Sequence, residues 1–481
     1  MIAISRVMGI LMIGFSFTYL APVIVSLIYT EHEEFYFFIT FAVTLLTGIG
    51  LWLPFINNNA ELRTRDGFVI VTLFWTVLAI FSALPLFLST NPNIGFTKAV
   101  FEATSGFTTT GATVLKGLDT MPKSILWYRM QLHFLGGLGI IVLAVAIMPL
   151  LGMGGMALFK AETPGPMKDE KITPRIAHTA RNLWYVYLGL YFACAVSYYV
   201  GGMSAFDALT HSFSTVATAG FSNYDDSLKH FNSPFIEWTA IVFMFLGGLS
   251  FTLHFLAFRG KKLSLYLQNI ELRVFVGIIV IVSLIITLTL MDNGVYNDIH
   301  TAFRTSLFQV IAMMTTTGFT TANFSQWPVF LPLLLIFMSF FGGCAGSTSG
   351  GIKIIRIILI VKQSGREIMR LIHPRAILHI KLGKRVIPES ILGGVWAFLG
   401  IYAFSTGILT LVMIGFGLSP LDAFSAVAAC LNVTGPGLGA VADNYASVSD
   451  GGLWVLIFAM LLGRLEIFTV FVLLTPAFWR D

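Results

Sequence analysis

The sequence predicts an all-α membrane protein whose helices cross the bilayer many times. Of its 481 residues, 56% are hydrophobic and only 11% are charged, whereas roughly 25% of the residues in soluble globular domains are charged. Several apolar stretches reach the roughly 20 residues that a helix needs to cross the hydrocarbon core. Because unpaired backbone groups are costly in lipid and the apolar runs do not alternate, we expect helices instead of a β-barrel. The composition therefore excludes soluble enzymes, disordered chains and coiled coils.

Ten apolar segments can be assigned as membrane spans. They cover about residues 7–30, 35–57, 68–90, 124–151, 183–203, 233–258, 272–291, 328–361, 388–416 and 452–478. The first segment lacks a small-residue cleavage site and is followed directly by the second. A retained helix is therefore favoured over a signal peptide.

The basic residues predict the orientation of the spans. One set of connections, together with the two ends of the chain, holds 22 Lys and Arg residues, and the other set holds only Lys98, Lys116, Lys123, Lys229 and Arg304. Because positive residues concentrate in cytoplasmic loops, both termini are expected in the cytoplasm. Acidic residues in the outer loops would concentrate cations there. No motif supports nucleic-acid binding by the basic face.

Four of the outer connections contain a short apolar stretch followed by hydroxyl residues and a glycine. These stretches are FTTTGA (107–112), TVATAGF (215–221), MTTTGFT (314–320) and LNVTGPG (431–437). Their glycines, Gly111, Gly220, Gly318 and Gly435, are separated by 109, 98 and 117 residues. A second glycine follows each of them after 26, 28, 25 and 28 residues, at Gly137, Gly248, Gly343 and Gly463. Such a period indicates a repeated unit made of a spanning helix, a re-entrant half helix, an extended glycine loop and a spanning helix.

The four loops have a composition that suits binding of a monovalent cation. Non-helical backbone at membrane depth is tolerated only inside protein or along a water-filled cavity. Four copies around one axis would present rings of carbonyl oxygens that replace the hydration shell of the ion. Glycine provides the backbone angles that turn successive carbonyls to one side. The alternative, that small residues only allow close helix packing, suffices for one loop but not for four; at the second set of glycines, packing is the favoured reading.

The loops, especially FEATSGFTTTGATV (101–114) and MTTTGFTTANF (314–324), resemble those of the Trk/Ktr/HKT superfamily of potassium transporters. The length and the extra N-terminal pair of helices are similar to the bacterial TrkH branch of this superfamily. The resemblance implies potassium uptake across the bacterial inner membrane. It also implies a homodimer on a cytoplasmic ring of nucleotide-binding, TrkA-type regulatory subunits.

The resemblance further implies four potassium-channel-like repeats in one chain around a central pore, preceded by two extra helices. The expected boundaries are 1–57 for the extra pair and 58–155, 156–260, 261–365 and 366–481 for the repeats. The K⁺ ligands of the selectivity filter, carried over by position, are Thr109, Thr110, Gly111, Thr218, Ala219, Gly220, Thr316, Thr317, Gly318, Val433, Thr434 and Gly435. The resemblance also implies that potassium is the transported ion and that this chain binds no cofactor of its own.

The third repeat contains a glycine-rich stretch, SFFGGCAGSTSGGIK (339–353), that interrupts an apolar run. Each interior glycine costs a helix about 1 kcal/mol, so we expect the helix to break there. The stretch is either a softened kink or a loop that gates permeation, and the resemblance favours a gate. The gate would contain Gly342, Gly343, Gly346, Ser347, Thr348, Ser349, Gly350 and Gly351.

Arg464 lies deep in the last predicted span, where a charge is expensive and usually finds a partner. One interpretation is a structural contact with carbonyls or an ion pair. The other is a positive charge beneath the filter that bonds to the glycine-rich loop and limits cation flow.

Nine basic residues between Lys353 and Arg385, together with the connection 152–181, form the expected docking surface for a cytoplasmic partner. The chain contains no ATP or NAD motif, so nucleotides would act only through that partner. Three other functions stay open: a symporter coupled to Na⁺ or H⁺ with the same filter, a transporter with inverted repeats, and, least favoured, a hydrolase that uses Ser222 and His254.

Overall fold

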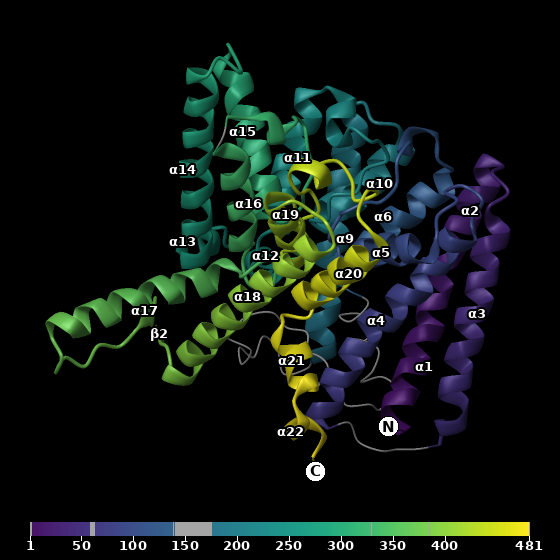
Figure 1. The fold of residues 1–481 in the computed structure, drawn as a ribbon, viewed down its shortest axis with the longest axis horizontal. Coiled ribbons are helices and arrows are strands. Elements are labelled where there is room, and N and C mark those ends of the chain that lie inside the picture. The colour runs from purple at the N-terminus through teal and green to yellow at the C-terminus, as the bar shows by residue number, and fades with distance from the viewer. Residues whose placement is uncertain are drawn as a thin grey trace.

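The computed structural model of the chain is built almost entirely of helices (Figure 1). It describes residues 2–57, 63–137, 139, 176–328, 330–383 and 385–480. The only sheet in these residues is a short hairpin, in which β1 (Lys381–Leu382) pairs antiparallel with β2 (Arg385–Val386), and Lys381 lies opposite Val386. The N- and C-terminal ends lie at the same end of the molecule (Figure 1).

A pair of helices comes first, as predicted. Helix α1 (Ile2–Ser16) continues through the 3-10 turn η1 (Phe17–Tyr19) into α2 (Leu20–Tyr29), and α3 (Glu34–Trp52) ends in the turn η2 (Leu53–Phe55). Two glycines bring α1 and α3 into backbone contact. A Cβ atom added to Gly9 would lie 2.7 Å from the carbonyl oxygen of Gly48, and one added to Gly48 would lie 2.9 Å from that of Gly9. Close packing through small residues is typical of membrane helices.

The remaining chain repeats one order of elements four times: a long helix, a short helix, a loop and a further helix. The first unit contains α4 (Thr64–Leu88), α5 (Phe96–Phe107), η3 (Leu118–Thr120) and α6 (Lys123–Gly137). The second contains α9 (Ile176–Val200), α10 (Ala205–Val216), η5 (Ser227–Phe231), α11 (Pro234–Gly247) and α12 (Phe251–Gly260). The third contains α13 (Ser264–Gln268), α14 (Ile270–Asp292), α15 (Ile299–Met314), η6 (Phe324–Gln326), α16 (Leu331–Phe341) and α17 (Ile354–Ile372). The fourth contains α18 (Glu389–Gly415), α19 (Pro420–Leu431), η7 (Gly439–Val441), α20 (Asp450–Arg464), α21 (Phe468–Leu474) and α22 (Pro476–Trp479).

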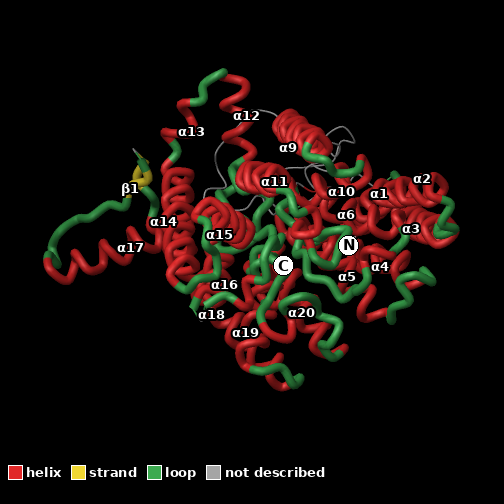
Figure 2. The backbone as a smooth tube through the Cα atoms, turned by 90° about the horizontal axis from the view of Figure 1, so that it is seen from above, coloured by secondary structure: helices red, strands yellow, loops and turns green. Residues whose placement is uncertain are grey.

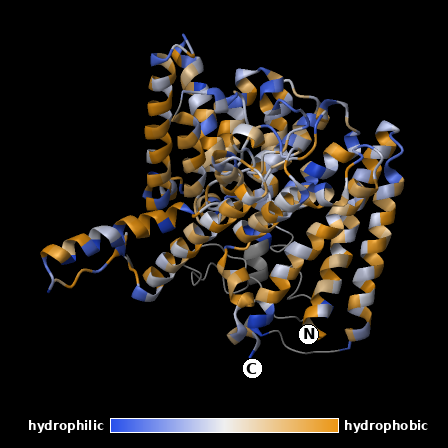
Figure 3. Cartoon of the chain, viewed as in Figure 1, coloured by the Kyte–Doolittle hydropathy of each residue, from blue (hydrophilic) through white to orange (hydrophobic). Residues whose placement is uncertain are grey.

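Six helices in the described residues are long and apolar enough to cross a membrane, and two bent pairs raise the number to eight. The six are Ile2–Tyr29, Glu34–Phe55, Arg65–Leu88, Arg181–Val200, Ile270–Asp292 and Glu389–Gly415. They match six of the ten predicted spans, and their surfaces are apolar along most of their length (Figure 3).

Three of the other four predicted spans are not single straight helices. The spans 233–258 and 452–478 bend by 93° between α11 and α12 and by 110° between α20 and α21. The span 328–361 breaks between Phe341 and Ile354, which confirms the helix break that the glycines predict. The second half of the predicted span 124–151, like most of the connection 152–181, lies outside the described residues.

Glycines at or next to the second repeated glycine position, where close packing is predicted, bring backbones into contact in three units. A Cβ atom added to Gly136 would overlap the carbonyl oxygen of Phe107, and one added to Gly463 would overlap that of Leu431. At Gly247 the same atom would lie 2.9 Å from the carbonyl oxygen of Val216. Each of these carbonyls belongs to the last residue of a short helix. In these three units the helix that follows the loop (α6, α11 or α20) is therefore packed directly against the end of the unit's own short helix.

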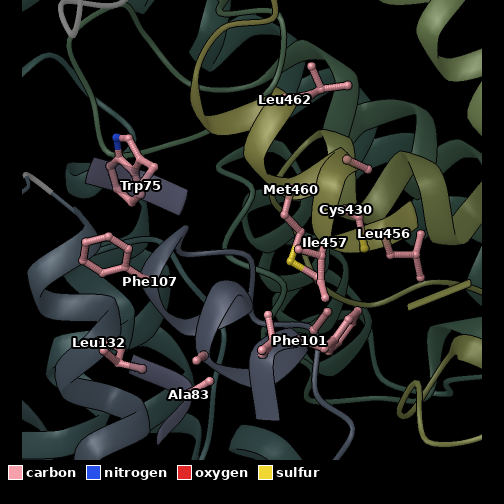
Figure 4. Close-up of a cluster of buried hydrophobic side chains, with 14 of the residues drawn as sticks. Trp75, Ala83, Phe101, Phe107, Leu132, Cys430, Leu456, Ile457, Met460 and Leu462 are labelled. Atoms are coloured by element: carbon pink, nitrogen blue, oxygen red, sulfur yellow. The ribbon is translucent and has the colours of Figure 1, made fainter. Parts of the chain in front are cut away.

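Buried apolar side chains hold the units together in two large clusters. One joins the N-terminal pair with the first and fourth units, and Figure 4 shows Phe101 beside Met460 and Ile457, with Trp75 and Phe107 together in another part of the cluster. The other joins the second and third units. Seen from above, the helices surround a central group of loops (Figure 2).

We predict that Gly48→Ala lowers the free energy of unfolding, because the added methyl group must push α1 and α3 apart. Overpacking of this kind costs about 1–3 kcal/mol. The matched control is Gly50→Ala in the same helix, where nothing lies within 4 Å of the added atom. Since alanine favours helix over glycine by about 1 kcal/mol, the control should be slightly more stable than the original chain. Thermal unfolding in detergent measures both, and equal stability of the two variants would contradict the close crossing.

Candidate functional site: a ring of four glycine loops

The four short helices all end with the same backbone geometry. The second residue after each helix has a positive φ angle, namely Thr109 (63°), Thr218 (51°), Thr316 (56°) and Val433 (61°). The amide of this residue donates to the carbonyl three residues earlier, and the next amide donates to the carbonyl five residues earlier, at 2.7–3.0 Å for the second bond. This is a Schellman motif, in which glycine is the usual residue with positive φ.

A β-branched residue occupies that strained position in every loop. Positive φ is a genuine outlier for such side chains, and it costs about 1–3 kcal/mol at each residue. Strain of this kind persists only where the surroundings hold it in place. The sequence did not reveal this feature, because threonine and valine carry no signal for a left-handed turn.

The loop glycines continue the pattern two residues later. Their φ angles are 79° at Gly111, 88° at Gly220, 75° at Gly318 and 94° at Gly435. Between each of them and the preceding strained residue stands one residue with negative φ: Thr110, Ala219, Thr317 or Thr434. Alternation of this kind turns successive carbonyls toward one side of the chain, and the glycine provides the second left-handed position without steric cost.

The glycines also bring the four loops into one closed ring. A Cβ atom added to Gly111 would overlap the carbonyl oxygen of Ala219, one on Gly220 that of Thr317, and one on Gly318 that of Thr434. The ring closes at Gly435, where the added atom would lie 2.7 Å from the carbonyl oxygen of Thr110. Every contact joins a glycine to the residue before the next glycine. The four loops therefore run in the same direction around one axis, which inverted repeats would not do.

A cavity of about 510 Å³ lies on the side of the ring where the loops continue toward the turns η3, η5, η6 and η7. All four loop glycines line it, together with charged side chains of both signs. The acids are Asp225, Asp226 and Asp443, and the bases are Lys116, Arg129 and Lys229. The acidic residues expected to concentrate cations are therefore accompanied at this cavity by an equal number of basic ones.

The glycine-rich segment between α16 and α17, residues 342–353, lies on the opposite side of the ring. The hydroxyl of Thr348 is 3.0 Å from that of Thr218, and the amide of Gly350 donates to the hydroxyl of Thr316 at 2.7 Å. A Cβ atom added to Gly350 would lie 3.0 Å from the Cβ of Val433. The segment thus contacts the strained residue of three loops, and it takes up positive φ at Gly342, Gly346 and Gly351.

Arg464 reaches the fourth strained residue. Its guanidinium donates to the hydroxyl of Thr109 at 3.3 Å and to the carbonyl of Thr348 at 3.4 Å. It also donates to the carbonyls of Gly136 and Gly137, and it lies 4.9 Å above the ring of Trp75. Both interpretations from the sequence are therefore compatible with the contacts, since the same side chain bonds to helix-end carbonyls and to the glycine-rich segment.

Two charged residues hold this segment. Glu271 was not singled out from the sequence, and Lys353, expected in the cytoplasmic docking surface, is instead buried against the segment. Glu271 accepts hydrogen bonds from the amides of Ala345 at 2.8 Å and Ile355 at 3.1 Å, so it fixes both ends of the turn. Lys353 donates to the carbonyl of Ser349 at 2.6 Å and to the hydroxyl of Ser347 at 3.3 Å. The sequence could have indicated both residues, because charged residues within or beside apolar segments usually have a specific partner.

Behind the first loop lies a buried ion pair that was also missed. Arg129 donates to Glu102 at 2.8 Å, and the two side chains are 1% and 0% exposed. Glu102 also accepts from the amide of Val114 and the hydroxyl of Thr113. Arg129 donates to the carbonyl of Ser222 at 3.2 Å and lies 4.1 Å above the ring of Phe221. The pair therefore ties the first loop to the second.

The position nine residues before each loop glycine differs in every unit. It is Glu102, His211, Gln309 or Ala426 in chain order. His211 bonds to Ser222 at 3.0 Å, and Gln309 is buried with neither of its amide atoms bonded within the described residues.

The hydrolase pairing of Ser222 with His254 is wrong, because His254 bonds instead to Tyr266 and the carbonyl of Leu246.

A central ring of parallel glycine loops inside a bundle of membrane helices defines a membrane transport protein. Residues 33–480 match the family model TrkH, described as cation transport protein, and the chain belongs to this family. The chain is 50% identical to the Trk system potassium uptake protein TrkH of Vibrio parahaemolyticus, over 100% of this chain and 99% of that protein. It is 49% identical to TrkH and 41% identical to TrkG of Escherichia coli, again over nearly full lengths.

A solved structure shares the fold. The crystal structure of the potassium transporter TrkH from Vibrio parahaemolyticus matches with a TM-score of 0.91 and 48% sequence identity, and the match covers 100% of this chain and 99% of that one. The recognition from the loop motifs and the predicted fold class are thereby confirmed. The relatives are named for transport, so this chain is a transporter and not an enzyme.

We predict that Arg129→Met destabilises the chain strongly, because it leaves the Glu102 carboxylate buried without its partner. Breaking one side of a buried pair costs about 3–5 kcal/mol. The double variant Glu102→Leu with Arg129→Met removes both charges and should recover much of that loss. Thermal unfolding in detergent compares the three proteins. A single variant as stable as the original chain would show that the pair contributes nothing.

Proposed function

We propose that this chain takes up potassium across the bacterial inner membrane through a selectivity filter made by the ring of loops. The ligands are the carbonyl oxygens, and the nearby hydroxyls, of the residues from Thr109 to Gly111, Thr218 to Gly220, Thr316 to Gly318 and Val433 to Gly435. The closed ring of contacts among the loop glycines carries this proposal, because it supports four backbones that line one axis in one register. Such oxygens replace the hydration shell of K⁺ without a full charge that would trap it.

The driving force in this proposal is the membrane potential. It supplies about 2.3 kcal/mol per charge for every 100 mV. Both termini and the basic connections face the cytoplasm, so that positive charge lies inside. The loops are unequal, since Ala219 and Val433 replace threonine and Pro436 follows the last glycine. We therefore propose that K⁺ is preferred over Na⁺ without strict exclusion of Na⁺.

We propose that residues 342–351 and Arg464 form the gate. The contacts of this segment and of Arg464 with Thr109, Thr218, Thr316 and Val433 support the proposal, because they cover the inner end of every loop. Glu271 and Lys353 hold the segment in this closed position. Opening requires that the segment leave the axis while its ends stay attached to α16 and α17.

We propose further that the chain is a homodimer regulated by a cytoplasmic nucleotide-binding ring of the TrkA type. Helix α17 and the β-hairpin project from the body of the molecule (Figure 1). Their surface carries basic residues beside exposed apolar ones such as Ile368, Leu371 and Ile372. This supports α17 and the segment that follows it as the docking surface for the partner.

Gly318→Ser should abolish most of the preference for K⁺ over Na⁺. The added side chain would overlap the carbonyl oxygen of Thr434 and lie 2.6 Å from the Cδ of Pro436, so it must distort two loops. The measurement is the reversal potential in a bilayer with potassium on one side and sodium on the other. The control is Gly294→Ser, where φ is also positive at 66° but nothing lies within 4 Å. An unchanged reversal potential for Gly318→Ser would refute the filter.

Deletion of Gly346 to Ser349 should raise potassium flux into liposomes in the absence of any partner, because it removes the contacts beneath the loops. Arg464→Ala should act in the same direction, since it frees Thr348 and Thr109. The monodispersity and unfolding temperature of each variant are measured first. Unchanged or lost flux in well-folded protein would contradict the gate. A current that saturates without any coupled ion separates a channel-like pore from a symporter.

A further inference from the structure

The carbonyl of Gly435 differs from those of the other three loop glycines. It accepts a hydrogen bond from the hydroxyl of Tyr445 at 2.8 Å. Within the described part of the chain, no hydrogen bond is accepted by the carbonyls of Gly111, Gly220 or Gly318. Ten residues after those glycines stand Met121, His230 and Pro328, none of which carries a hydroxyl group. The four loops therefore differ in how their glycine carbonyls are bonded.

Tyr445 is held firmly in a position behind the loops. The residue is 1% exposed, and its ring lies 5.4 Å from that of Phe101 on the short helix α5. Its amide donates to the carbonyl of Thr113 at 2.8 Å. The hydroxyl of Thr113 in turn donates to Glu102, the partner of Arg129. A rigid chain of bonds thus fixes the phenol relative to the first loop while its hydroxyl holds the fourth.

We propose that Tyr445 is a specificity-determining residue that draws the carbonyl of Gly435 away from the pore axis. This proposal rests on the filter proposed above. A backbone carbonyl oxygen has two lone pairs, and the buried hydroxyl of Tyr445 engages one of them and attracts the oxygen toward itself. The outer end of the filter then offers a passing ion three free glycine carbonyls in place of four. Selectivity for K⁺ depends on the number of carbonyl dipoles that replace its hydration shell. Tyr445 therefore weakens the discrimination between K⁺ and Na⁺.

The test is Tyr445→Phe, which keeps the ring against Phe101 and the backbone bond to Thr113 and removes only the hydroxyl. We expect the K⁺ to Na⁺ permeability ratio, obtained from reversal potentials, to rise by roughly threefold or more, as the loss of one ordinary hydrogen bond permits. The matched control is Tyr128→Phe. Tyr128 is also buried, and its hydroxyl donates to the carbonyl of Ser82 at 2.8 Å, away from the loops.

A higher ratio in Tyr445→Phe with no change in Tyr128→Phe supports the assignment. An unchanged or lower ratio in Tyr445→Phe overturns it, as does an equal rise in both variants. Gly318→Ser, measured in the same bilayers, separates the two levels of proposal. If Gly318→Ser changes the ratio and Tyr445→Phe does not, the role of Tyr445 fails alone, whereas no change in either variant removes the filter itself.

Discussion

The contact between each loop glycine and a carbonyl of the next loop is the constraint on which the rest of the structure depends. A side chain at any of these glycines would meet backbone that belongs to another unit. The ring can therefore close only if all four short helices end at the same level along its axis and the loops leave them in the same direction. The repeated Schellman geometry achieves this, with strained residues at Thr109, Thr218, Thr316 and Val433. Burial between the short helices and the helices that follow the loops holds that strain.

Elements that depend on local periodicity could be predicted from the sequence. The long apolar helices, the four loops and the break between α16 and α17 follow from span length, from a period near a hundred residues and from clustered glycine. The glycines that follow the loop glycines also predicted close helix packing correctly, except at Gly343, which lies between α16 and α17 and not in a helix. These features could be predicted because backbone hydrogen bonds in lipid must be made within the protein, which leaves the chain few possible conformations.

Features that depend on contacts between distant residues could not be predicted in the same way. The sharp bends after α11 and α20 arise where each helix meets the end of a short helix. No residue type at these positions predicts a bend. The partners of Glu102, Glu271 and Arg464 lie up to hundreds of positions away in sequence. The charge of these residues indicates that they need partners, but the sequence does not show which residues those partners are. The mixed charge of the cavity lined by the loop glycines also required the folded positions of Lys116 and Lys229.

Closure of the ring within one polypeptide has a consequence for how such a protein can diverge. In a tetramer of identical subunits every substitution occurs four times, and a change tolerable once is often fatal in quadruplicate. Here each quarter has its own codons, so glutamate, histidine, glutamine and alanine stand at one equivalent position behind the loops. For the filter proposed above, evolution can therefore change the ligands of one loop and leave the other three loops unaltered.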